Sequence, residues 1–314
     1  MRAIGTTDLR IYPLALGGNT FGWTADEATS QEILDAFVAS GGNFVDTADS
    51  YSAWVPGNAG GESETILGTW MAARKNRGSM VIATKVSQHP QFKGLSPRNV
   101  AAAAEASLRR LQTDRIDLYF AHYDDTATPL EETVAAFDAL VRAGKVRHVG
   151  LSNYSATRIE KWIRIATEHG FALPVALQPH YNLVARASFE QNLAPIAAQH
   201  RLGVFPYYSL ASGFLTGKYR ARSDAEGARR SVAVSRHLND DGLRVITALD
   251  EIATARKVSI ATTALAWLLH KPTITAPLAS VSKAAQLPEL MAARRLALTA
   301  TEVARLDEAS KPFA

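Results

Sequence analysis

Phe44-Val45-Asp46-Thr47-Ala48-Asp49-Ser50-Tyr51 is the stretch from which we predict the fold. Its two β-prone residues end in a carboxylate, and a tyrosine follows five residues later in a polar loop. The stretch is too polar to be only a strand of the core and too regular to be only a loop. We therefore interpret it as a short buried strand whose carboxyl end carries functional side chains.

The order of short β-prone run, polar loop and amphipathic helix repeats along the chain. It predicts eight strands, over about 14–17, 44–46, 80–85, 116–122, 146–151, 175–178, 203–207 and 274–278. It predicts helices over about 29–39, 62–72, 96–111, 128–144, 155–169, 187–199, 241–257, 259–270, 284–293 and 299–309. The segment 210–240 is basic and has weak periodicity.

Eight strands that alternate with helices indicate a parallel sheet. Because composition does not change along the chain, we expect one domain over residues 1–314. The predicted fold is a (β/α)8 TIM barrel with an N-terminal hairpin before Pro13 and extra C-terminal helices. An open doubly wound sheet is the alternative, but it would need Gly-x-Gly-x-x-Gly after an early strand, which Gly17-Gly18-Asn19-Thr20-Phe21-Gly22 does not match.

Composition narrows the classes of function. The chain has 314 residues, of which 47% are hydrophobic and 20% charged, and it has no apolar run long enough to span a membrane. It has no cysteine, which excludes disulfides, thiolate zinc sites and cysteine nucleophiles. With no apolar signal segment at the N-terminus, we expect a cytoplasmic protein. The net charge of +4 is spread among acidic residues, which favours an ordinary surface over a nucleic-acid footprint, although a few cations could bind a phosphorylated ligand.

The predicted strand ends carry the candidate catalytic residues, because the active site of such a barrel lies there. Asp46 and Tyr51 follow the second strand, Lys85 ends the third and His122 ends the fourth. Three of them have an ordinary explanation. Asp46 could cap a turn, Tyr51 could be a surface aromatic residue, and His122 could be a core histidine with satisfied hydrogen bonds. Lys85 is harder to explain in that way, because an apolar run precedes it and a buried lysine needs a carboxylate such as Asp46. Together, at successive strand ends, they favour a functional site.

These four residue types suit proton transfer to an oxygen. A tyrosine is a poor acid at neutral pH, and a cationic lysine close to its hydroxyl lowers its pKa. An aspartate holds the lysine in place and charged, and a neutral histidine can orient a carbonyl. The set does not make a nucleophile, a hydrolytic triad or a metal site. Strands five to seven end in further hydrogen-bonding residues: Ser152, Asn153, Gln178 and Tyr207.

In these motifs the chain resembles the aldo-keto reductase family over essentially its whole length. The motifs are Asp46-Thr47-Ala48-x-x-Tyr51, Gly61-x-Ser63-Glu64-x-x-Leu67-Gly68, Thr84-Lys85, Ile116-Asp117-Leu118-Tyr119-x-x-His122, Gly150-Leu151-Ser152-Asn153-Tyr154 and Leu210-Ala211-x-Gly213-x-Leu215-Thr216-Gly217-Lys218. Each is weak alone, whereas the ordered set is specific. The resemblance implies a (β/α)8 barrel that reduces aldehydes and ketones, usually with NADPH.

The resemblance also implies roles for individual residues. Tyr51 would be the proton donor, Lys85 and Asp46 would tune it, and His122 would orient the substrate carbonyl. Ser152, Asn153 and Gln178 would bond the nicotinamide amide, and Tyr207 would stack on its ring. The rest of the cofactor would meet Leu210, Ser212, Gly213, Leu215, Lys218, Arg229, Ser280, Ser282, Lys283 and Gln286.

The cofactor segments also depart from the family pattern. Ser280 stands where a glycine is common, and Leu290 replaces an asparagine that contacts the adenine, which leaves the adenine contacts open. For Arg229 and Lys283 a solvated surface charge is the alternative. Residues 213–218 superficially resemble a phosphate-binding P-loop, but their glycine spacing is one residue short and Tyr219 stands in place of Ser or Thr.

The substrate side is predicted from aromatic residues. The loop 52–60 is longer than is typical of the family, and its Trp54, together with Trp23 and Tyr123, is a candidate substrate contact. Aromatic walls favour apolar or ring-bearing carbonyl compounds, although these rings could instead pack a loop base. No carboxylate-binding arginine stands near a strand end, so acidic substrates are not indicated.

An alternative function is a redox-sensing, nicotinamide-binding regulatory subunit on the same barrel, like the potassium-channel β-subunits. The intact set of four catalytic candidates argues against it as the sole role. The sequence leaves open the physiological substrate, the direction of the reaction, the strictness of NADPH over NADH, and whether the protein is a monomer or an oligomer.

Overall fold

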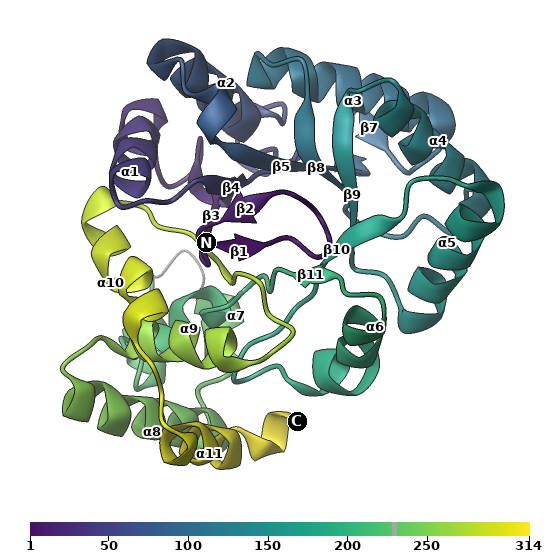
Figure 1. The fold of residues 1–314 in the computed structure, drawn as a ribbon. Helices are drawn as coiled ribbons and strands as arrows, with labels where there is room; N and C mark the ends of the chain where they lie inside the picture. The colour runs from purple at the N-terminus through teal and green to yellow at the C-terminus, as the bar shows by residue number, and fades with distance from the viewer. Residues whose placement is uncertain (228–230) are drawn as a thin grey trace.

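A closed ring of parallel strands forms the centre of the computed structural model, which describes residues 1–227 and 231–314 (Figure 1). The strand order is β11-β10-β9-β8-β5-β4-β3-β12. The ring closes where Val204 bridges Ile274 and the Leu278 N–H donates to the Pro206 carbonyl at 2.9 Å. The predicted (β/α)8 barrel is therefore confirmed. Its strands are β3 Ala15–Gly17, β4 Phe44–Asp46, β5 Val81–Val86, β8 Ile116–Ala121, β9 Val146–Ser152, β10 Pro174–Gln178, β11 Gly203–Val204 and β12 Leu278–Ala279.

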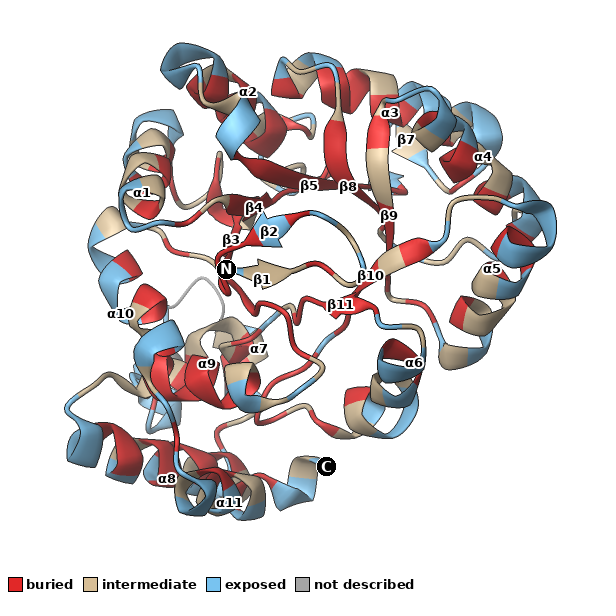
Figure 2. Cartoon of the chain, viewed as in Figure 1, coloured by how far each residue is buried: buried red, intermediate tan, exposed pale blue. Residues whose placement is uncertain are grey.

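The strands are apolar because both of their faces are covered. Every residue of β5 and β8 is buried. Side chains such as Phe44 and Phe205, with ring centroids 5.0 Å apart, fill the interior of the barrel. Gly150 makes room for that filling, since a Cβ there would lie 2.4 Å from the Phe120 ring. Figure 2 shows the buried strands inside helices whose outer faces are exposed.

Helices surround the barrel, and several of them begin at a side-chain cap. The Asp26 side chain accepts the Thr29 N–H at the start of α1, and Thr299 and Glu302 form a capping box at the start of α11. The extra C-terminal helices are confirmed, with α8 and α11 packed against each other at the foot of Figure 1. The helices are α1 Glu27–Ala39, α2 Glu62–Arg74, α3 Pro97–Leu111, α4 Leu130–Arg142, α5 Ala156–His169, α6 Ala194–Gln199, α7 Ser231–Ser235, α8 Asp240–Arg256, α9 Ile260–His270, α10 Leu287–Ala292 and α11 Ala300–Ala309.

The N-terminal hairpin closes one end of the barrel. Its strands, β1 Arg2–Ala3 and β2 Arg10–Ile11, pair antiparallel and lie across the barrel in Figure 1. Ile4 and Ile11 are fully buried in the same cluster as the barrel interior. Because the hairpin covers the amino ends of the strands, the functional residues are left at the opposite end.

Three local features differ from the sequence prediction. A short hairpin, β6 Gln88–His89 and β7 Phe92–Lys93, follows β5 and was not predicted. The helix expected over 187–199 begins as a π-helix, Phe189–Leu193, before α6. Pro195, in the first turn of α6, lacks the N–H that would continue a regular ladder. The seventh strand is shorter than predicted, and the eighth, β12, begins only at the last residue of its predicted range; single bridges such as His180 to Tyr207 and Val204 to Ile274 replace the ladder there.

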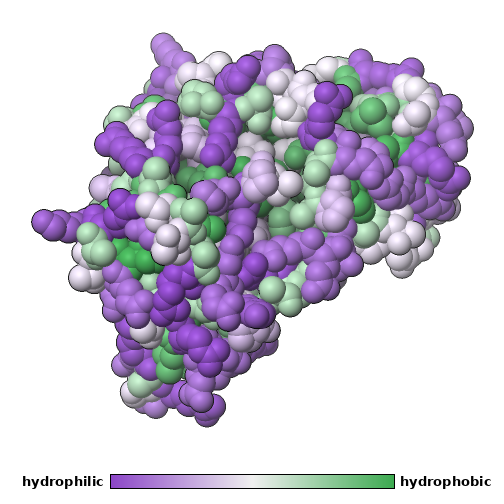
Figure 3. All heavy atoms as spheres, turned by 60° about the horizontal axis from the view of Figure 1, so that its bottom comes forward, coloured by the Kyte–Doolittle hydropathy of each residue, from purple (hydrophilic) through white to green (hydrophobic). Residues whose placement is uncertain are grey.

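The surface is mixed in polarity. Figure 3 shows hydrophilic residues spread widely over the face brought forward, with hydrophobic residues between them. Among the described helices, none combines the length and the apolar character needed to cross a bilayer.

Candidate active site

Lys85 is the centre of the site. It lies on β5 and is fully buried, and its Nζ donates to Asp46 Oδ2 at 2.6 Å, to the Thr47 carbonyl at 2.6 Å and to the Tyr51 hydroxyl at 2.9 Å. An ammonium group has three N–H donors, so each one has an acceptor here. Adjacent strands β4 and β5 bring these groups together, as their pairing in the sheet requires.

Asp46 is held from two directions. Its side chain is 2% exposed, and while Oδ2 accepts from Lys85, Oδ1 accepts from Gln178 Nε2 at 2.8 Å. Gln178 ends β10, on the far side of the barrel opening from β4. The carboxylate is therefore fixed in position by residues of two other strands, β5 and β10.

Burial and charge act against each other in this ion pair. Burial raises the pKa of Asp46 and lowers the pKa of Lys85, and the opposite charge of each partner counters that shift. At 2.6 Å, with the further bonds to Gln178 and Thr47, we treat the pair as ionised.

Tyr51 departs from the expectation that a neighbouring lysine lowers its pKa. Burial first, and then the negative charge of Asp46, hold the pKa of Tyr51 well above its usual range. The physical reason is that Asp46 neutralises the positive charge of Lys85, so that little is left to offset the desolvation of a phenolate. Tyr51 therefore keeps its proton at neutral pH, and forming its phenolate is harder than for a free tyrosine.

His122 follows β8 and faces Tyr51. The two ring centroids are 6.2 Å apart with the planes at 74°. Burial and the charge of Lys85 lower the pKa of His122 well below its usual value, so its imidazole is neutral. Its Nδ1 is buried and has no hydrogen-bond partner in the described part of the chain.

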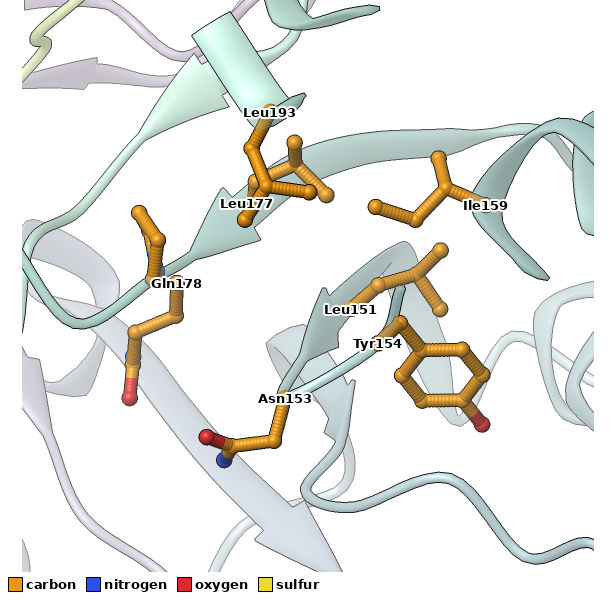
Figure 4. A pocket seen from close by; sticks show the side chains of 8 residues that line it. Leu151, Asn153, Tyr154, Ile159, Leu177, Gln178 and Leu193 are labelled. Carbon is orange, nitrogen blue, oxygen red and sulfur yellow. The ribbon is translucent and has the colours of Figure 1, made fainter. Parts of the chain in front are cut away.

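Four polar residues at the ends of β9, β10 and β11 adjoin this group. Tyr207 donates its hydroxyl to Asn153 Oδ1 at 2.8 Å, and Asn153 Nδ2 donates to the His122 carbonyl at 2.9 Å. Ser152 Oγ donates to the Gln178 carbonyl at 2.9 Å. In Figure 4 the amides of Asn153 and Gln178 point away from the apolar side chains that line a small pocket between β9, β10 and α5.

The predicted phosphate segments lie on two loops. Ser212 and Gly213 have left-handed backbones, with φ of 58° and 99°, in the tight turn after Leu210, and Leu215 is fully buried beneath that turn. In the other loop, Gln286 Oε1 accepts the backbone N–H groups of Ser282 at 2.9 Å and of Lys283 at 3.2 Å. Both loops are thus shaped by their own hydrogen bonds.

The second loop reaches the opening of the barrel. Ser280 Oγ contacts Asn19 Oδ1 and lies against Gly17, which pairs with Asp46 in the sheet. Leu290, which follows this loop, is only 5% exposed and packs into the core.

The cations predicted to bind the cofactor phosphates are Lys218, Lys283 and Arg229. Lys218 and Lys283 are exposed, and within residues 1–227 and 231–314 neither pairs with a carboxylate; Lys218 lies over the Tyr219 ring at 4.9 Å. Arg229 lies outside the described residues.

The predicted substrate residues surround Tyr51 and His122. Trp54 is 52% exposed, and its ring centroid lies 6.2 Å from that of Tyr51 and 5.7 Å from that of Trp23. Tyr123 is 45% exposed and lies 5.1 Å from the His122 ring. The three aromatic residues are thus neighbours of the candidate catalytic residues, and their contact with a substrate stays a prediction.

Sequence reasoning missed Tyr208 and a buried acidic pair. Tyr208 is 54% exposed and its ring centroid lies 5.2 Å from that of Tyr207, and the repeated tyrosine at 207–208 was the available signal. Glu64 and Asp49 are fully buried. Glu64 accepts from Arg110 Nε at 2.7 Å, whereas both Asp49 oxygens lack partners among the described residues and burial raises the pKa of Asp49 well above its usual range.

The described residues contain no group of three or more histidine, aspartate and glutamate side chains placed to hold a metal ion. The residues that the site brings together are a protonated tyrosine beside a buried ammonium and a neutral histidine that faces the tyrosine.

Comparison with known proteins gives a consistent identification. The sequence profile of the Aldo/keto reductase family matches residues 13–311. Norsolorinic acid reductase B of Aspergillus parasiticus is 32% identical, over 96% of this chain and 81% of its own. A probable voltage-gated potassium channel subunit beta of Oryza sativa subsp. japonica is 32% identical, over 92% of this chain and 89% of its own. The uncharacterized oxidoreductase YrpG of Bacillus subtilis is 33% identical, over 94% of this chain and 91% of its own. With the barrel and these matches together, the chain belongs to the aldo/keto reductase family.

Proposed function

We propose that the chain is an NADPH-dependent reductase of small aldehydes and ketones, in which residues 1–314 act as one domain and Tyr51 is the general acid. The observation that carries the proposal is the contact of the Tyr51 hydroxyl with the buried Lys85 ammonium at 2.9 Å. Nicotinamide cofactors are general in this family, and the bound cofactor supplies the hydride.

The residues of the chain donate the proton that the carbonyl oxygen receives. Tyr51 stays protonated because burial raises its pKa, so it has a proton to give to the carbonyl oxygen. As the proton leaves, the developing phenolate keeps the hydrogen bond that the Lys85 ammonium donates to its oxygen at 2.9 Å. Neutral His122, facing Tyr51, orients the carbonyl oxygen toward the hydroxyl.

The donor set of this chain fits a phosphorylated nicotinamide dinucleotide. Amides and a hydroxyl beside the site, from Asn153, Gln178 and Ser152, suit a nicotinamide amide, and the half-buried Tyr207 ring suits its face. Lys218 and Lys283 are cations without a carboxylate partner in the described chain, and cations and hydroxyls are the groups that bind phosphate. We place the phosphates and adenosine at Leu210, Ser212, Gly213, Leu215, Lys218, Ser280, Ser282, Lys283 and Gln286, with Arg229 at the 2′-phosphate.

The substitution Tyr51→Phe tests the proposal. It should reduce NADPH oxidation with any carbonyl substrate by about 10²- to 10⁴-fold, because it removes the general acid. NADPH binding, followed by protein fluorescence, should stay within about twofold of wild type, since Tyr51 contributes no phosphate contact. Absorbance at the NADPH band over a panel of aldehydes, ketones and sugars gives the rates, and parallel runs with NADH give the cofactor preference.

Tyr154→Phe is the matched control. It also removes a buried hydroxyl, but that hydroxyl has no hydrogen-bond partner among the described residues. We expect wild-type turnover from it. Unchanged turnover in Tyr51→Phe would defeat the proposal.

A regulatory role is the second candidate, because relatives from Oryza sativa and Arabidopsis thaliana are named as probable potassium channel subunits. It predicts tight NADPH binding with no turnover of any carbonyl in the panel. Turnover that depends on Tyr51 would decide for the reductase.

A further inference from the structure

Three exposed rings surround the reacting hydroxyl and form an aromatic rim, which consists of Trp54, Tyr123 and Tyr208. Their side chains are 52%, 45% and 54% exposed, and they come from the loops after β4, β8 and β11. Large rings are usually covered in a soluble protein, so three of them exposed around one site indicate a binding surface.

Contacts place the rim around the site. Trp54 meets Tyr51 with ring centroids 6.2 Å apart, and Tyr123 meets His122 at 5.1 Å. The Tyr208 ring lies 5.2 Å from that of Tyr207, whose hydroxyl donates to Asn153, and Asn153 in turn donates to the His122 carbonyl. The three rings therefore belong to the surroundings of Tyr51 and His122.

The backbone of Tyr208 has an unfavourable conformation. Its backbone is left-handed, with φ of 53°, a conformation that a bulky residue rarely adopts. Its carbonyl accepts from Asn182 Nδ2 at 2.9 Å and from the Ala211 N–H at 2.7 Å, which fixes that conformation. Strained backbone of this kind gathers at ligand sites, where the surrounding structure imposes it.

The ring of Tyr208 is equally fixed. It contacts Tyr207 edge to face, with centroids 5.2 Å apart and planes at 69°, and His180 likewise at 5.5 Å and 78°. Tyr207 and His180 in turn stack on each other at 5.3 Å. Two rings thus support Tyr208 on one side, while about half of its surface remains open to a ligand.

We propose that Tyr208 is a specificity-determining residue and that, with Trp54 and Tyr123, it binds an aromatic ring attached to the reacting carbonyl. The substrates are then aromatic aldehydes and ketones. This inference rests on the proposed reductase function. Ring pairs attract one another edge to face or offset, and the tyrosine hydroxyls can bond polar substituents of such a ring.

Other classes of substrate fit less well. A carboxylate substrate needs an available cation, but the three donors of Lys85, the cation that contacts Tyr51, are all in use. An open-chain sugar needs several convergent hydrogen-bonding groups, whereas the rim offers mainly ring surface.

Benzaldehyde and cyclohexanecarbaldehyde make a matched pair of probes, because they have nearly the same size and differ in aromaticity. Tyr208→Leu keeps apolar volume and removes the ring. We expect it to lower kcat/KM for benzaldehyde by about threefold to tenfold, mainly through KM, and to change kcat/KM for cyclohexanecarbaldehyde by less than about twofold. Trp54→Leu should shift selectivity in the same direction.

Leu173→Ala is the control, since Leu173 is also exposed, at 49%, but precedes β10 at the opposite end of the barrel. It should leave the ratio of kcat/KM for the two substrates unchanged.

Equal losses of kcat/KM for both aldehydes in both leucine variants would overturn the proposal. So would a wild-type dimer, seen by light scattering, that Tyr208→Leu dissociates, because a second copy would then cover the rim. If Tyr51→Phe remains fully active, the reductase function itself fails; if Tyr51→Phe is inactive while selectivity does not move, only this inference fails.

Discussion

Lys85 shows how one buried residue joins the stability of the barrel to its chemistry. Its ammonium is fully buried and is compensated by Asp46 at 2.6 Å. A buried charge whose partner is removed is strongly destabilising, whereas removing both charges is often nearly neutral. The same contact that stabilises the fold therefore also holds the cation beside the Tyr51 hydroxyl.

Lys85→Met should destabilise the protein by about 3–5 kcal/mol, because it leaves the Asp46 carboxylate buried and unpaired. Asp46→Asn should cost a similar free energy for the converse reason. The double variant should recover most of that loss and remain inactive. Urea unfolding of the four proteins gives the coupling free energy, and losses that simply add in the double variant would contradict the account.

At the scale of elements, α2 and α3 pack closely behind the site. A Cβ at Gly68 of α2 would lie 2.1 Å from the Arg110 carbonyl oxygen, which belongs to the backbone of α3. The pairing matters to the site because Arg110 also bonds Glu64, whose other oxygen accepts from Thr84, the neighbour of Lys85 on β5.

Gly68→Ala should destabilise the protein by roughly 1–3 kcal/mol, because backbone cannot move aside for the added methyl group. In an unobstructed helix the same change would be favourable. Gly78→Ala is the matched control, since nothing lies within 4 Å of its Cβ position. Thermal unfolding of the two variants measures the difference, and equal stabilities would show that the helices can separate at no cost.

The elements also show where sequence reasoning succeeds. Strand β4, predicted over 44–46 and found there, is a short run bounded by turn signals. Because the ends of adjacent strands such as β4 and β5 meet, Asp46, Lys85 and Tyr51 could be grouped from the sequence. The hairpin β6–β7 could not be predicted, because strands of two residues are too short to show a periodic pattern. The backbone of Tyr208 depends on Asn182, 26 residues away, which no local pattern records.

The direction in which the pKa of Tyr51 shifts could not be predicted from the sequence either. The residue types indicate an attraction between lysine and phenolate, but the outcome depends on how deeply the hydroxyl is buried and on where Asp46 lies. Both quantities come from tertiary packing.

At the scale of the molecule, the two ends of the barrel differ in what they do. The hairpin that contains β1 and β2 fills the end at the start of the strands, with Ile4 and Ile11 in the core. The other end carries Tyr51, Lys85 and the aromatic rim. This division lets the closed end stabilise the fold while the open end presents reactive groups.

The central claim is that this open end directs a hydride and the Tyr51 proton to one carbonyl. The most direct test uses NADPH deuterated at the transferred position of nicotinamide C4, with benzaldehyde, and analyses the alcohol by mass spectrometry. The account predicts one deuterium at the carbinol carbon, transferred at equal rates by wild type and Tyr154→Phe and about 10²- to 10⁴-fold more slowly by Tyr51→Phe. Alcohol without deuterium, or labelled alcohol formed by Tyr51→Phe at the wild-type rate, would contradict it.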